Sequence, residues 1–394
     1  MNEHLLNPEI QQFISENYKI PTSEIVLKGS PFKAVSVQEL ATQIFGKRKA
    51  ERKLPTWFKN NQILYPPTLN LEQTSSEITA EYKASLISGK SLADLTGGFG
   101  IDTFFFSKKT ERVVYFEINT ELSELARHNF KVLTSENIQT INKDAIAHLK
   151  ATDVHFDWIF IDPSRRDDAG GRVFLLSDCI PNVPENLDFL FQKTDQILLK
   201  TSPLLDISAG ISELKNISEI HIVAVNNDVK ELLWVLEKVP SEAIKLKTIN
   251  FKNNENQVFE SSFEENENAQ ISFSSPLTYL FEPNPAIMKS GMFSSLGSFF
   301  NLKKLQVNTH LFTSGSPIEN FPGRSFKIEK ILDFNGKKLK KELNISTANI
   351  TTRNFPLSVA EIRKRFKIAE GGETYMFFTT IEKEKKIVLI CRKL

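Results

Sequence analysis

Residues 91–117, SLADLTGGFGIDTFFFSKKTERVVYFE, decide the fold. The run begins with a short apolar segment and turns through a glycine cluster formed by Gly97, Gly98 and Gly100. It continues with a helix-length apolar stretch and closes on a second short apolar segment that ends at Glu117. Glycines let a backbone turn tightly and approach a ligand closely because they carry no side chain. This order predicts a strand, a glycine turn, a helix and a second strand parallel to the first.

The same alternation continues beyond this stretch. Short apolar segments recur at IQTIN, FDWIFID, QILLKTS and EIHIVAV, and helix-length segments such as ELSELARHNFKVL lie between most of them. Strands that alternate with helices form parallel, doubly wound sheets. We therefore predict an α/β domain with a Rossmann-like seven-stranded sheet. In this reading VKELLWVLEK (229–238) is a helix, and AIKLKTINF and QVFESSF supply an antiparallel edge.

Composition changes mark the other parts of the chain. Residues 1–72 read as a helical N-terminal region, with a capping box at Ser36 and Glu39. The α/β domain is assigned to 73–268. A small module punctuated by proline and glycine follows at 269–320, and a basic, strand-rich α+β domain at 321–394.

The glycine turn by itself does not identify a ligand. Gly98 and Gly100 match the first half of the G-x-G-x-x-G dinucleotide fingerprint, but position 103 is Thr, which argues against a pyrophosphate. A P-loop would need Gly-Lys-Ser/Thr, which is absent here. A lone glycine cluster is equally compatible with a simple tight turn.

Acidic residues near the ends of the predicted strands make the signal more specific. Asp94 lies in the first strand, Glu117 closes the second, Asp144 follows the third and Asp162 ends the fourth. A carboxylate at Glu117 can accept hydrogen bonds from vicinal ribose hydroxyls, and one at Asp144 can accept from an exocyclic amine of a base. Four acids suit a ligand with ribose, adenine and cationic parts, and suit a diphosphate poorly.

Together, DLTGGFG, Glu117, Asp144 and the DPSRR segment that begins at Asp162 resemble the motifs of class I S-adenosylmethionine-dependent methyltransferases. The preceding LEQTSSEITAEYKASL (71–86) and LADLTGGFGIDTFFFS resemble a narrower group within that class. Members of this group carry a C-terminal THUMP-like domain, often after a small ferredoxin-like module. The resemblance implies that the module at 269–320 is ferredoxin-like and that the basic domain at 321–394 is THUMP-like.

The resemblance also implies a set of cofactor-binding residues. Asp94 and the glycine loop would border the methionine part of S-adenosyl-L-methionine, Glu117 the ribose and Asp144 the adenine. Residues before the first strand, including Ser75, would fold over the methionine end. The full predicted set is Gln73, Ser76, Thr79, Asp94, Thr96, Gly97, Gly98, Phe99, Gly100, Glu117, Ile118, Asp144, Ala145 and Asp162.

The segment Asp162-Pro163-Ser164-Arg165-Arg166 is the predicted catalytic site. Amino methyltransferases carry Asp/Asn-Pro-Pro-Tyr/Phe here, so this chain keeps Asp-Pro and lacks the aromatic platform. Asp162 is the candidate proton acceptor, and Pro163, Ser164 and Arg165 complete the predicted catalytic set. Arginine stays protonated and cannot act as a base, but Arg165 or Arg166 could hold a phosphate, stack on a base, or pair with the neighbouring Asp167 and Asp168. Lys200, Thr201, Ser202 and Pro203, after the fifth strand, are expected beside this loop.

Several classes of function are excluded or disfavoured. The 394 residues hold two cysteines, Cys179 and Cys391, which make neither a disulfide framework nor a metal-binding pair, so a reducing cytoplasm is expected. Neither cysteine lies in a recognised nucleophile motif, and the six histidines show no metal-ligand spacing, so no metal is predicted. No apolar run reaches the ~18 residues of a membrane-spanning helix, and no signal peptide is expected.

Charge is distributed unevenly along the chain. Residues 324–394 carry 17 Lys and Arg against 8 Asp and Glu, or +9, within a net charge of +1, so the first 323 residues carry −8. A basic module beside an acidic catalytic body suits a polyanionic substrate, although a solvated lysine-rich surface would have the same composition. With the THUMP resemblance, this predicts RNA, as tRNA or rRNA, as the partner. Arg363, Lys364 and Arg365 are the predicted contacts.

Two other functions remain open at this point. The chain could be a non-catalytic RNA-binding or assembly factor that keeps a vestigial cofactor pocket, because Ser-Arg-Arg replaces the usual fourth motif. It could also be an NAD-dependent oxidoreductase, which Thr103 argues against. A protein or small-molecule acceptor is a further alternative to RNA. The oligomeric state is not predicted.

Overall fold

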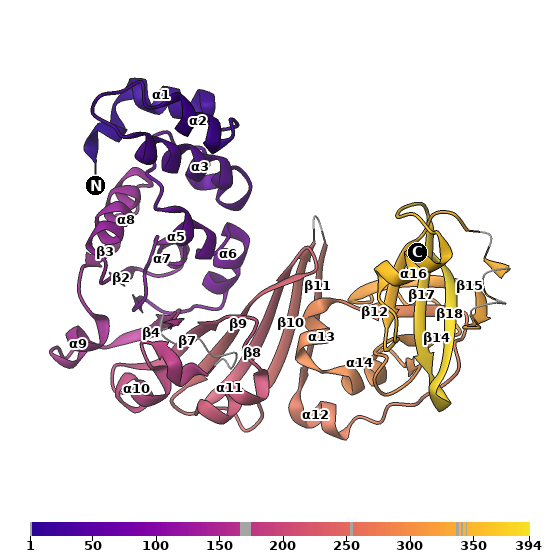
Figure 1. Ribbon diagram of the computed structural model, residues 1–394. Helices are drawn as coiled ribbons and strands as arrows, with labels where there is room; N and C mark the ends of the chain where they lie inside the picture. The colour runs from indigo at the N-terminus through magenta and orange to yellow at the C-terminus, as the bar shows by residue number, and fades with distance from the viewer. Residues whose placement is uncertain (1, 166–174, 253–254, 336–338, 340–341, 344) are drawn as a thin grey trace. The chain divides into compact units, whose positions relative to one another are not determined.

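The computed structural model describes residues 2–165, 175–252, 255–335, 339, 342–343 and 345–394. The chain forms two compact units, coloured by residue number in Figure 1. The first unit comprises Met1–Thr201, Ser208–Asn216 and Trp234–Pro240, and the second comprises Ser202–Ile207, Ile217–Leu233 and Ser241–Leu394. Each unit is described separately below.

The N-terminal part of the first unit is helical, as predicted. Ser36 and Glu39 form the expected capping box, in which the Ser36 side chain accepts from the Glu39 N–H and the Glu39 carboxylate accepts from the Ser36 N–H. Leu40 and Ile44 then pack with Ile14 in a small apolar core. The elements are η1 (Glu3–Leu6), α1 (Pro8–Asn17), α2 (Thr22–Lys28), α3 (Val37–Lys53), α4 (Pro55–Phe58), α5 (Thr68–Gln73) and α6 (Glu77–Ser85).

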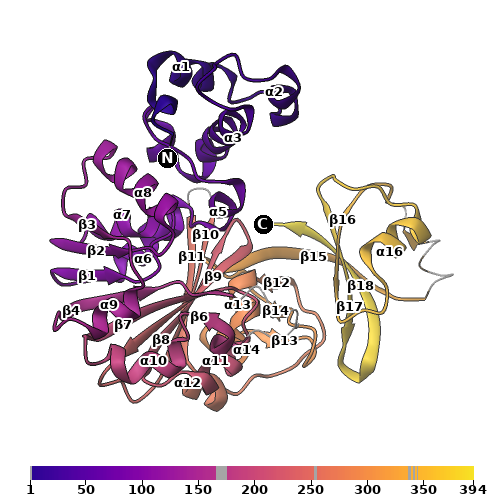
Figure 2. The same cartoon turned by 60° about the vertical axis from the view of Figure 1, so that its left-hand side comes forward.

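A parallel sheet follows in the first unit, with strand order β7-β4-β1-β2-β3 (Figure 2). The central strand is β1 (Ser91–Asp94), which pairs on one side with β4 (Phe156–Ile161) and on the other with β2 (Arg112–Phe116). Because these strands are parallel, their carboxyl ends meet at one edge of the sheet. The other elements are β3 (Ile138–Ile141), β7 (Thr194–Thr201), α7 (Ile101–Ser107), α8 (Thr120–Val132), α9 (Ala145–Lys150) and α10 (Val183–Leu190).

The prediction of a helix at VKELLWVLEK is wrong, because Asp228–Glu237 forms strand β9. Its residues from Leu232 to Leu236 are all buried, so this run is covered on both faces. A short apolar run that is buried all round carries no periodicity that separates a strand from a helix. Here Trp234 and Val235, which favour strands, were the better guide.

The predicted α/β class is confirmed. In the second unit, β8 (Ile217–Val225) pairs in parallel with β10 (Lys245–Lys252), and β10 pairs antiparallel with β11 (Glu255–Ser262). Of the two segments expected to form an antiparallel edge, only the second therefore runs antiparallel. Helix α11 (Ile207–Glu213) precedes β8, and α12 (Phe263–Asn268) follows β11.

The C-terminal part of the second unit is built on a seven-stranded sheet of order β13-β14-β12-β15-β18-β17-β16. Strand β12 (Tyr279–Pro283) pairs antiparallel with β15 (Gly323–Asp333), so the predicted modules at 269–320 and 321–394 contribute to one sheet. The predicted domain boundaries stay a prediction. The remaining elements are α13 (Pro285–Ser290), α14 (Phe293–Phe299), β13 (Lys303–Lys304), β14 (Phe312–Ser314), β16 (Asn349–Arg353), α16 (Val359–Phe366), β17 (Thr374–Ile381), η3 (Glu382–Glu384) and β18 (Lys385–Lys393).

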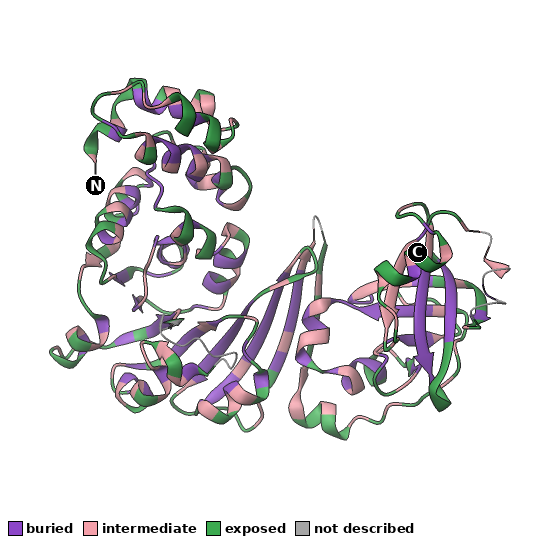
Figure 3. Ribbon diagram, viewed as in Figure 1, coloured by how far each residue is buried: buried purple, intermediate pink, exposed green. Residues whose placement is uncertain are grey.

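In this C-terminal sheet, β17 and β18 each contain a continuous run of buried residues (Figure 3). Phe377 and Leu389 pack with Phe326 and Leu280 on one face, and Phe378 and Val388 belong to a second cluster. The alternation of these residues places successive side chains on opposite faces, as strand geometry requires. Among the described residues, no helix has the length and apolar character needed to cross a membrane.

Candidate active site

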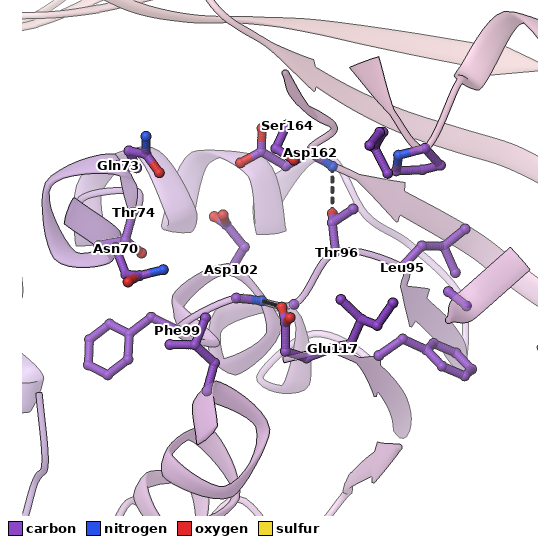
Figure 4. Close-up of a pocket in the computed structure, with 18 of the residues that line it drawn as sticks. Asn70, Gln73, Thr74, Leu95, Thr96, Phe99, Asp102, Glu117, Asp162 and Ser164 are labelled. Carbon is purple, nitrogen blue, oxygen red and sulfur yellow. Dashed lines mark hydrogen bonds between the residues drawn. The ribbon is translucent and has the colours of Figure 1, made fainter. Parts of the chain in front are cut away.

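The carboxyl ends of β1, β2 and β4 open onto a cavity of about 350 Å³ in the first unit. Figure 4 shows Asp102, Glu117 and Asp162 around this space, with Gln73 and Asn70 approaching from α5. Most of the predicted site residues line it. These are Gln73, Thr96, Gly97, Gly98, Phe99, Glu117, Ile118, Asp144, Ala145, Asp162 and Ser164.

Five predicted site residues do not line the cavity: Ser76, Thr79, Asp94, Gly100 and Pro163. Ser76 is the N-cap of α6 and accepts from the backbone N–H of Thr79, which is buried. Arg165 belongs by its backbone to a short strand, β5 (Ser164–Arg165), paired with β6 (Cys179–Ile180). Arg166, Asp167 and Asp168 lie outside the described residues. The predicted contacts of Arg166 therefore stay predictions.

The glycine turn is required by close packing against the sheet. A Cβ at Gly97 would lie 2.1 Å from Cε2 of Tyr115, and one at Gly100 would lie 2.5 Å from Cζ of Phe130. Gly100 also has a φ of +84°, in the left-handed region that residues with a side chain rarely adopt. The Tyr115 hydroxyl donates to the Gly98 carbonyl at 2.6 Å, which fixes the turn over β2.

Asp94 is buried beneath the glycine turn, bonds to residues on either side of it, and does not line the cavity. Its side chain is buried and accepts a hydrogen bond from the Thr96 N–H at 3.0 Å and another from the Thr103 hydroxyl at 2.5 Å. Burial raises the pKa of the Asp94 carboxyl to about 7, although these two hydrogen bonds act in the opposite direction. The carboxylate therefore ties the glycine turn to the start of α7.

Glu117 and Asp144 approach the cavity from the next two strands. One Glu117 carboxylate oxygen accepts from the Gly98 N–H at 2.9 Å, and the other accepts from the Asn119 N–H at 2.7 Å. Asp144 is exposed and caps α9 by accepting from the Ala147 N–H at 2.7 Å. A carboxylate has more acceptor capacity than these bonds use, so both side chains can also accept from a ligand.

Asp162 is fixed by contacts to two neighbouring strands. Its N–H donates to the Thr96 hydroxyl at 2.7 Å, and its side chain pairs with Lys200 Nζ at 2.5 Å. Lys200 lies near the end of β7, which pairs with β4, so the predicted proximity of Lys200 to the Asp162 loop is confirmed. Thr201 is instead buried, and its hydroxyl accepts from the Trp234 indole at 3.0 Å.

An acid that the sequence analysis missed, Asp102, lines the same cavity. It accepts from the Ser75 hydroxyl at 2.8 Å and lies 3.2 Å from Nζ of Lys83, whose side chain is fully buried. Lys83 also donates to Ser75 at 3.1 Å. The available signal was an acid in the first helical turn after the glycine cluster. Ser75, expected over the methionine end, also lines the cavity. The other lining residues that the prediction did not include are Asn70, Thr74, Leu95, Ile101, Phe116, Leu122, Lys143, Ile146, Ile180 and Pro181.

The predicted RNA contacts lie in the last turn of α16, in the second unit. The Arg363 guanidinium donates to two backbone carbonyls, of Ala348 at 3.2 Å and Ile368 at 3.3 Å. Arg365 lies over the Phe334 and Phe366 rings. Arg363 thus has a local structural role, and the assignment of Arg363, Lys364 and Arg365 to RNA stays a prediction.

Metal ligands were not predicted. Within the part of the chain that the structure describes, no group of three His, Cys, Asp or Glu is placed to hold a metal ion.

Two family models match the chain. A THUMP domain-like model matches residues 323–393, and a ferredoxin-like domain model matches residues 279–322.

Two known proteins are similar to larger parts of the chain. A solved structure from Porphyromonas gingivalis, named "putative methyltransferase", is 32% identical, with a TM-score of 0.88 over 99% of this chain and 98% of that one. An "uncharacterized RNA methyltransferase" of Mycoplasma mobile is 27% identical over 163 residues. That match covers 39% of this chain, and the chain spans 44% of the length of the Mycoplasma protein.

Gly97→Ala is expected to disrupt the glycine turn. A Cβ at position 97 would meet the Tyr115 ring at 2.1 Å, whereas at Gly98 the nearest atom is 3.9 Å away. We expect Gly97→Ala to lower the free energy of unfolding by about 2–3 kcal/mol, as overpacking does. Gly98→Ala, whose cost is backbone strain alone at a φ of +53°, should lose about 1–2 kcal/mol. Denaturant unfolding measures both, and equal losses would contradict the packing argument.

Asp94→Asn is expected to change how stability depends on pH. The pKa of Asp94 rises from 3.8 to about 7 on folding, so the folded protein keeps this proton over that range. The stability contributed by the protonated form is present at low pH and is lost as the pH rises toward 7. Between pH 5 and 8 the free energy of unfolding of wild type should therefore fall relative to Asp94→Asn, by on the order of 2 kcal/mol. A difference that is constant across this range would contradict the assignment.

Proposed function

Because the chain belongs to the methyltransferase family that carries a C-terminal THUMP-like domain, we propose that it transfers a methyl group from S-adenosyl-L-methionine to RNA. One observation carries the proposal. The acids at the ends of neighbouring parallel strands, Glu117, Asp144 and Asp162, line a single cavity beside a glycine turn. In this proposal Asp162 is the group nearest the acceptor.

The cavity fits an adenosyl cofactor better than a dinucleotide. Its volume of about 350 Å³ lies at the lower end of the range for small-molecule sites, roughly 300–1,000 Å³. Four carboxylates line it, those of Asp102, Glu117, Asp144 and Asp162, together with Lys143. Lys83 pairs with Asp102 and Lys200 with Asp162, so these groups together carry one net negative charge. Such a lining attracts a cation and repels a diphosphate. The balance of charge disfavours the NAD-dependent alternative.

The residues divide among the parts of the proposed cofactor. Glu117 would accept hydrogen bonds from the ribose hydroxyls, and Asp144 from the adenine amine, because carboxylates accept from both kinds of donor. At the methionine end, the sequence analysis assigned Asp94, but Asp94 is buried under the turn. We therefore propose Asp102 for the ammonium group, with Gln73 and Asn70 close by.

Methyl transfer depends more on the alignment of the acceptor with the methyl group than on strong acid or base catalysis by the protein. When bound, the cofactor supplies an electrophilic methyl group on a sulfonium that already carries its leaving group. The chain then has to orient the acceptor, limit access of water and take up one proton. In this proposal the Asp162 carboxylate takes up the proton, and its ion pair with the Lys200 ammonium, 2.5 Å away, supports the assignment by fixing the orientation of the carboxylate. Ser164 lines the cavity beside Asp162 and is available to contact the acceptor.

Three observations support RNA as the acceptor. The Mycoplasma relative is named an RNA methyltransferase, residues 323–393 match a THUMP-like model, and residues 324–394 carry a charge of +9. Positive charge on a small domain favours a polyanion through counterion release. The class of RNA, tRNA or rRNA, and the modified atom are left to experiment.

Substitutions at Glu117 and Asp162 should separate cofactor binding from turnover. We expect Glu117→Gln to weaken S-adenosylmethionine binding about 10-fold or more in calorimetry, because one acceptor becomes a donor. Asp162→Asn should keep the affinity within about 3-fold and reduce methyl transfer to RNA about 100-fold, as loss of a proton acceptor does. Glu136→Gln and Asp153→Asn, at exposed positions outside the cavity, are matched controls. Unaltered affinity in Glu117→Gln would remove the ribose assignment.

Nucleoside mass spectrometry of cellular RNA tests the reaction itself. RNA from a deletion strain should lack one methylated nucleoside found in the parent, and the wild-type gene should restore it while an Asp162→Asn gene does not. If the deletion changes no methylated nucleoside although purified protein binds S-adenosylmethionine, the chain is instead a non-catalytic RNA-binding factor. The replacement of the usual fourth-motif residues by Ser-Arg-Arg after Asp162-Pro163 is the feature that favours that alternative.

A further inference from the structure

We propose that a second cavity, bordered by Arg324 and Arg353 in the second unit, binds a backbone phosphate of single-stranded RNA. This inference deepens the proposed function and rests on RNA being the substrate. The proposed phosphate contact is formed by side chains of β12, β15 and β16. It is separate from the α16 residues that were predicted from sequence to bind RNA.

The two arginines are fixed by one buried acid. Glu282 lies on β12 directly opposite Arg324 on β15, and its side chain is 4% exposed. Arg324 Nε donates to one Glu282 oxygen at 2.6 Å, and Arg353 Nη2 donates to the other at 2.8 Å. Arg324 Nη2 also reaches the same carboxylate and, at 3.4 Å, the Thr351 hydroxyl. Both guanidinium groups are thereby held in place before any ligand arrives.

The hydrogen-bond donors of this cluster exceed its acceptors. Each guanidinium has more N–H groups than one shared carboxylate can satisfy. Among the described residues, no side chain or carbonyl accepts from Nη1 of either arginine, and Nε of Arg353 is buried without an acceptor. The Arg324 and Arg353 side chains remain 34% and 35% exposed. Planar donors in surplus are what a phosphate requires, because guanidinium groups bind its oxygens in pairs.

The charge around the cluster is also positive beyond the two arginines. Lys304 is buried nearby, with its ammonium 4.9 Å from the centroid of the Phe293 ring, on which the His310 ring stacks. The pKa of His310 is lowered to about 4, first by burial and then by the positive charges of Lys304 and Arg353. Glu282 neutralises one of the three cations, which leaves two positive charges, and a backbone phosphate would neutralise one of them.

The shape of the cavity selects a single strand over a duplex. Its volume is about 380 Å³, which is the scale of one nucleotide and too small to enclose a duplex. Pro283, Pro285 and Met288 line it with apolar surface, against which a ribose or an unstacked base can pack. The arrangement of a cationic edge beside an apolar wall is typical of sites that hold single-stranded nucleic acid.

An internal ion pair alone would not need this arrangement. One arginine neutralises Glu282, and the second leaves a positive charge on the cluster without an acid of its own. Two arginines on one acid at the border of a cavity therefore leave a charge that a bound anion would neutralise. The same argument predicts that RNA binding stabilises the second unit.

The test measures binding of a fluorescein-labelled 12-nucleotide single-stranded RNA by anisotropy at several salt concentrations. Arg324→Gln and Arg353→Gln should each weaken binding about 10-fold and reduce the magnitude of the salt slope by up to about 0.7, the value for one phosphate, because both arginines hold the same phosphate. Arg392→Gln removes the same charge from β18 at a side chain that is 68% exposed, and should leave both values nearly unchanged. A duplex of the same sequence should be affected much less than the single strand.

A second measurement avoids substitutions that could unfold the protein. Phenylglyoxal modifies accessible arginines in the wild-type chain, and mass spectrometry locates the products. The single-stranded RNA should protect Arg324 and Arg353 but not Arg392. Equal affinity and slope in both folded variants, or equal modification with and without RNA, would overturn the proposal. Protection by inorganic phosphate but not by RNA would overturn the RNA assignment.

These outcomes are independent of the methyl-transfer chemistry. Calorimetry with S-adenosylmethionine probes the first unit only, so the Arg324 and Arg353 variants should bind the cofactor like wild type. If wild type binds RNA through these arginines but binds no S-adenosylmethionine, the proposed reaction fails and the RNA site stands. If cofactor binding and methyl transfer are intact but the arginines are unprotected, the RNA site fails alone.

Discussion

The hydrogen bonds from Thr96 and Thr103 to the buried Asp94 carboxylate are the constraint on which the site depends. They hold the chain that leaves β1 in a tight turn. In this turn the Gly97 backbone packs directly against the Tyr115 ring. The turn in turn presents the Gly98 N–H to Glu117 and the Thr96 hydroxyl to the backbone of Asp162. One buried carboxyl thus sets the positions of groups that come from three different strands.

Parallel strand order explains why much of the site could be predicted from sequence. When β4, β1 and β2 are neighbours, the residues that follow them must meet at one edge, whatever the intervening helices do. Glu117, Asp144 and Asp162 were found in this way, and Lys200 was placed beside Asp162 by the same reasoning. The capping box at Ser36 was equally local, since its pattern spans only four residues.

The misses share a different origin. The position of an acid in a strand does not show whether its side chain faces a ligand or the neighbouring backbone. Asp94 was therefore assigned to the cofactor, although its side chain accepts from the backbone of Thr96. Asp102 was missed because its importance comes from Lys83 and Ser75, which precede the first strand of the sheet and meet it only in the folded chain. β9 was read as a helix because complete burial removes periodicity. The Glu282 cluster joins residues more than forty positions apart, a distance that no motif spans.

The acidic lining of the first cavity has a consequence for the end of the catalytic cycle. A site with a net negative charge holds a positively charged molecule more firmly than an uncharged one of the same shape. Donation of the methyl group converts the cationic sulfonium into a neutral thioether, so in the proposed reaction the spent molecule loses the part of the attraction that came from the sulfonium and keeps its other contacts. The same side chains that capture the fresh methyl donor would then favour release of the product and limit product inhibition.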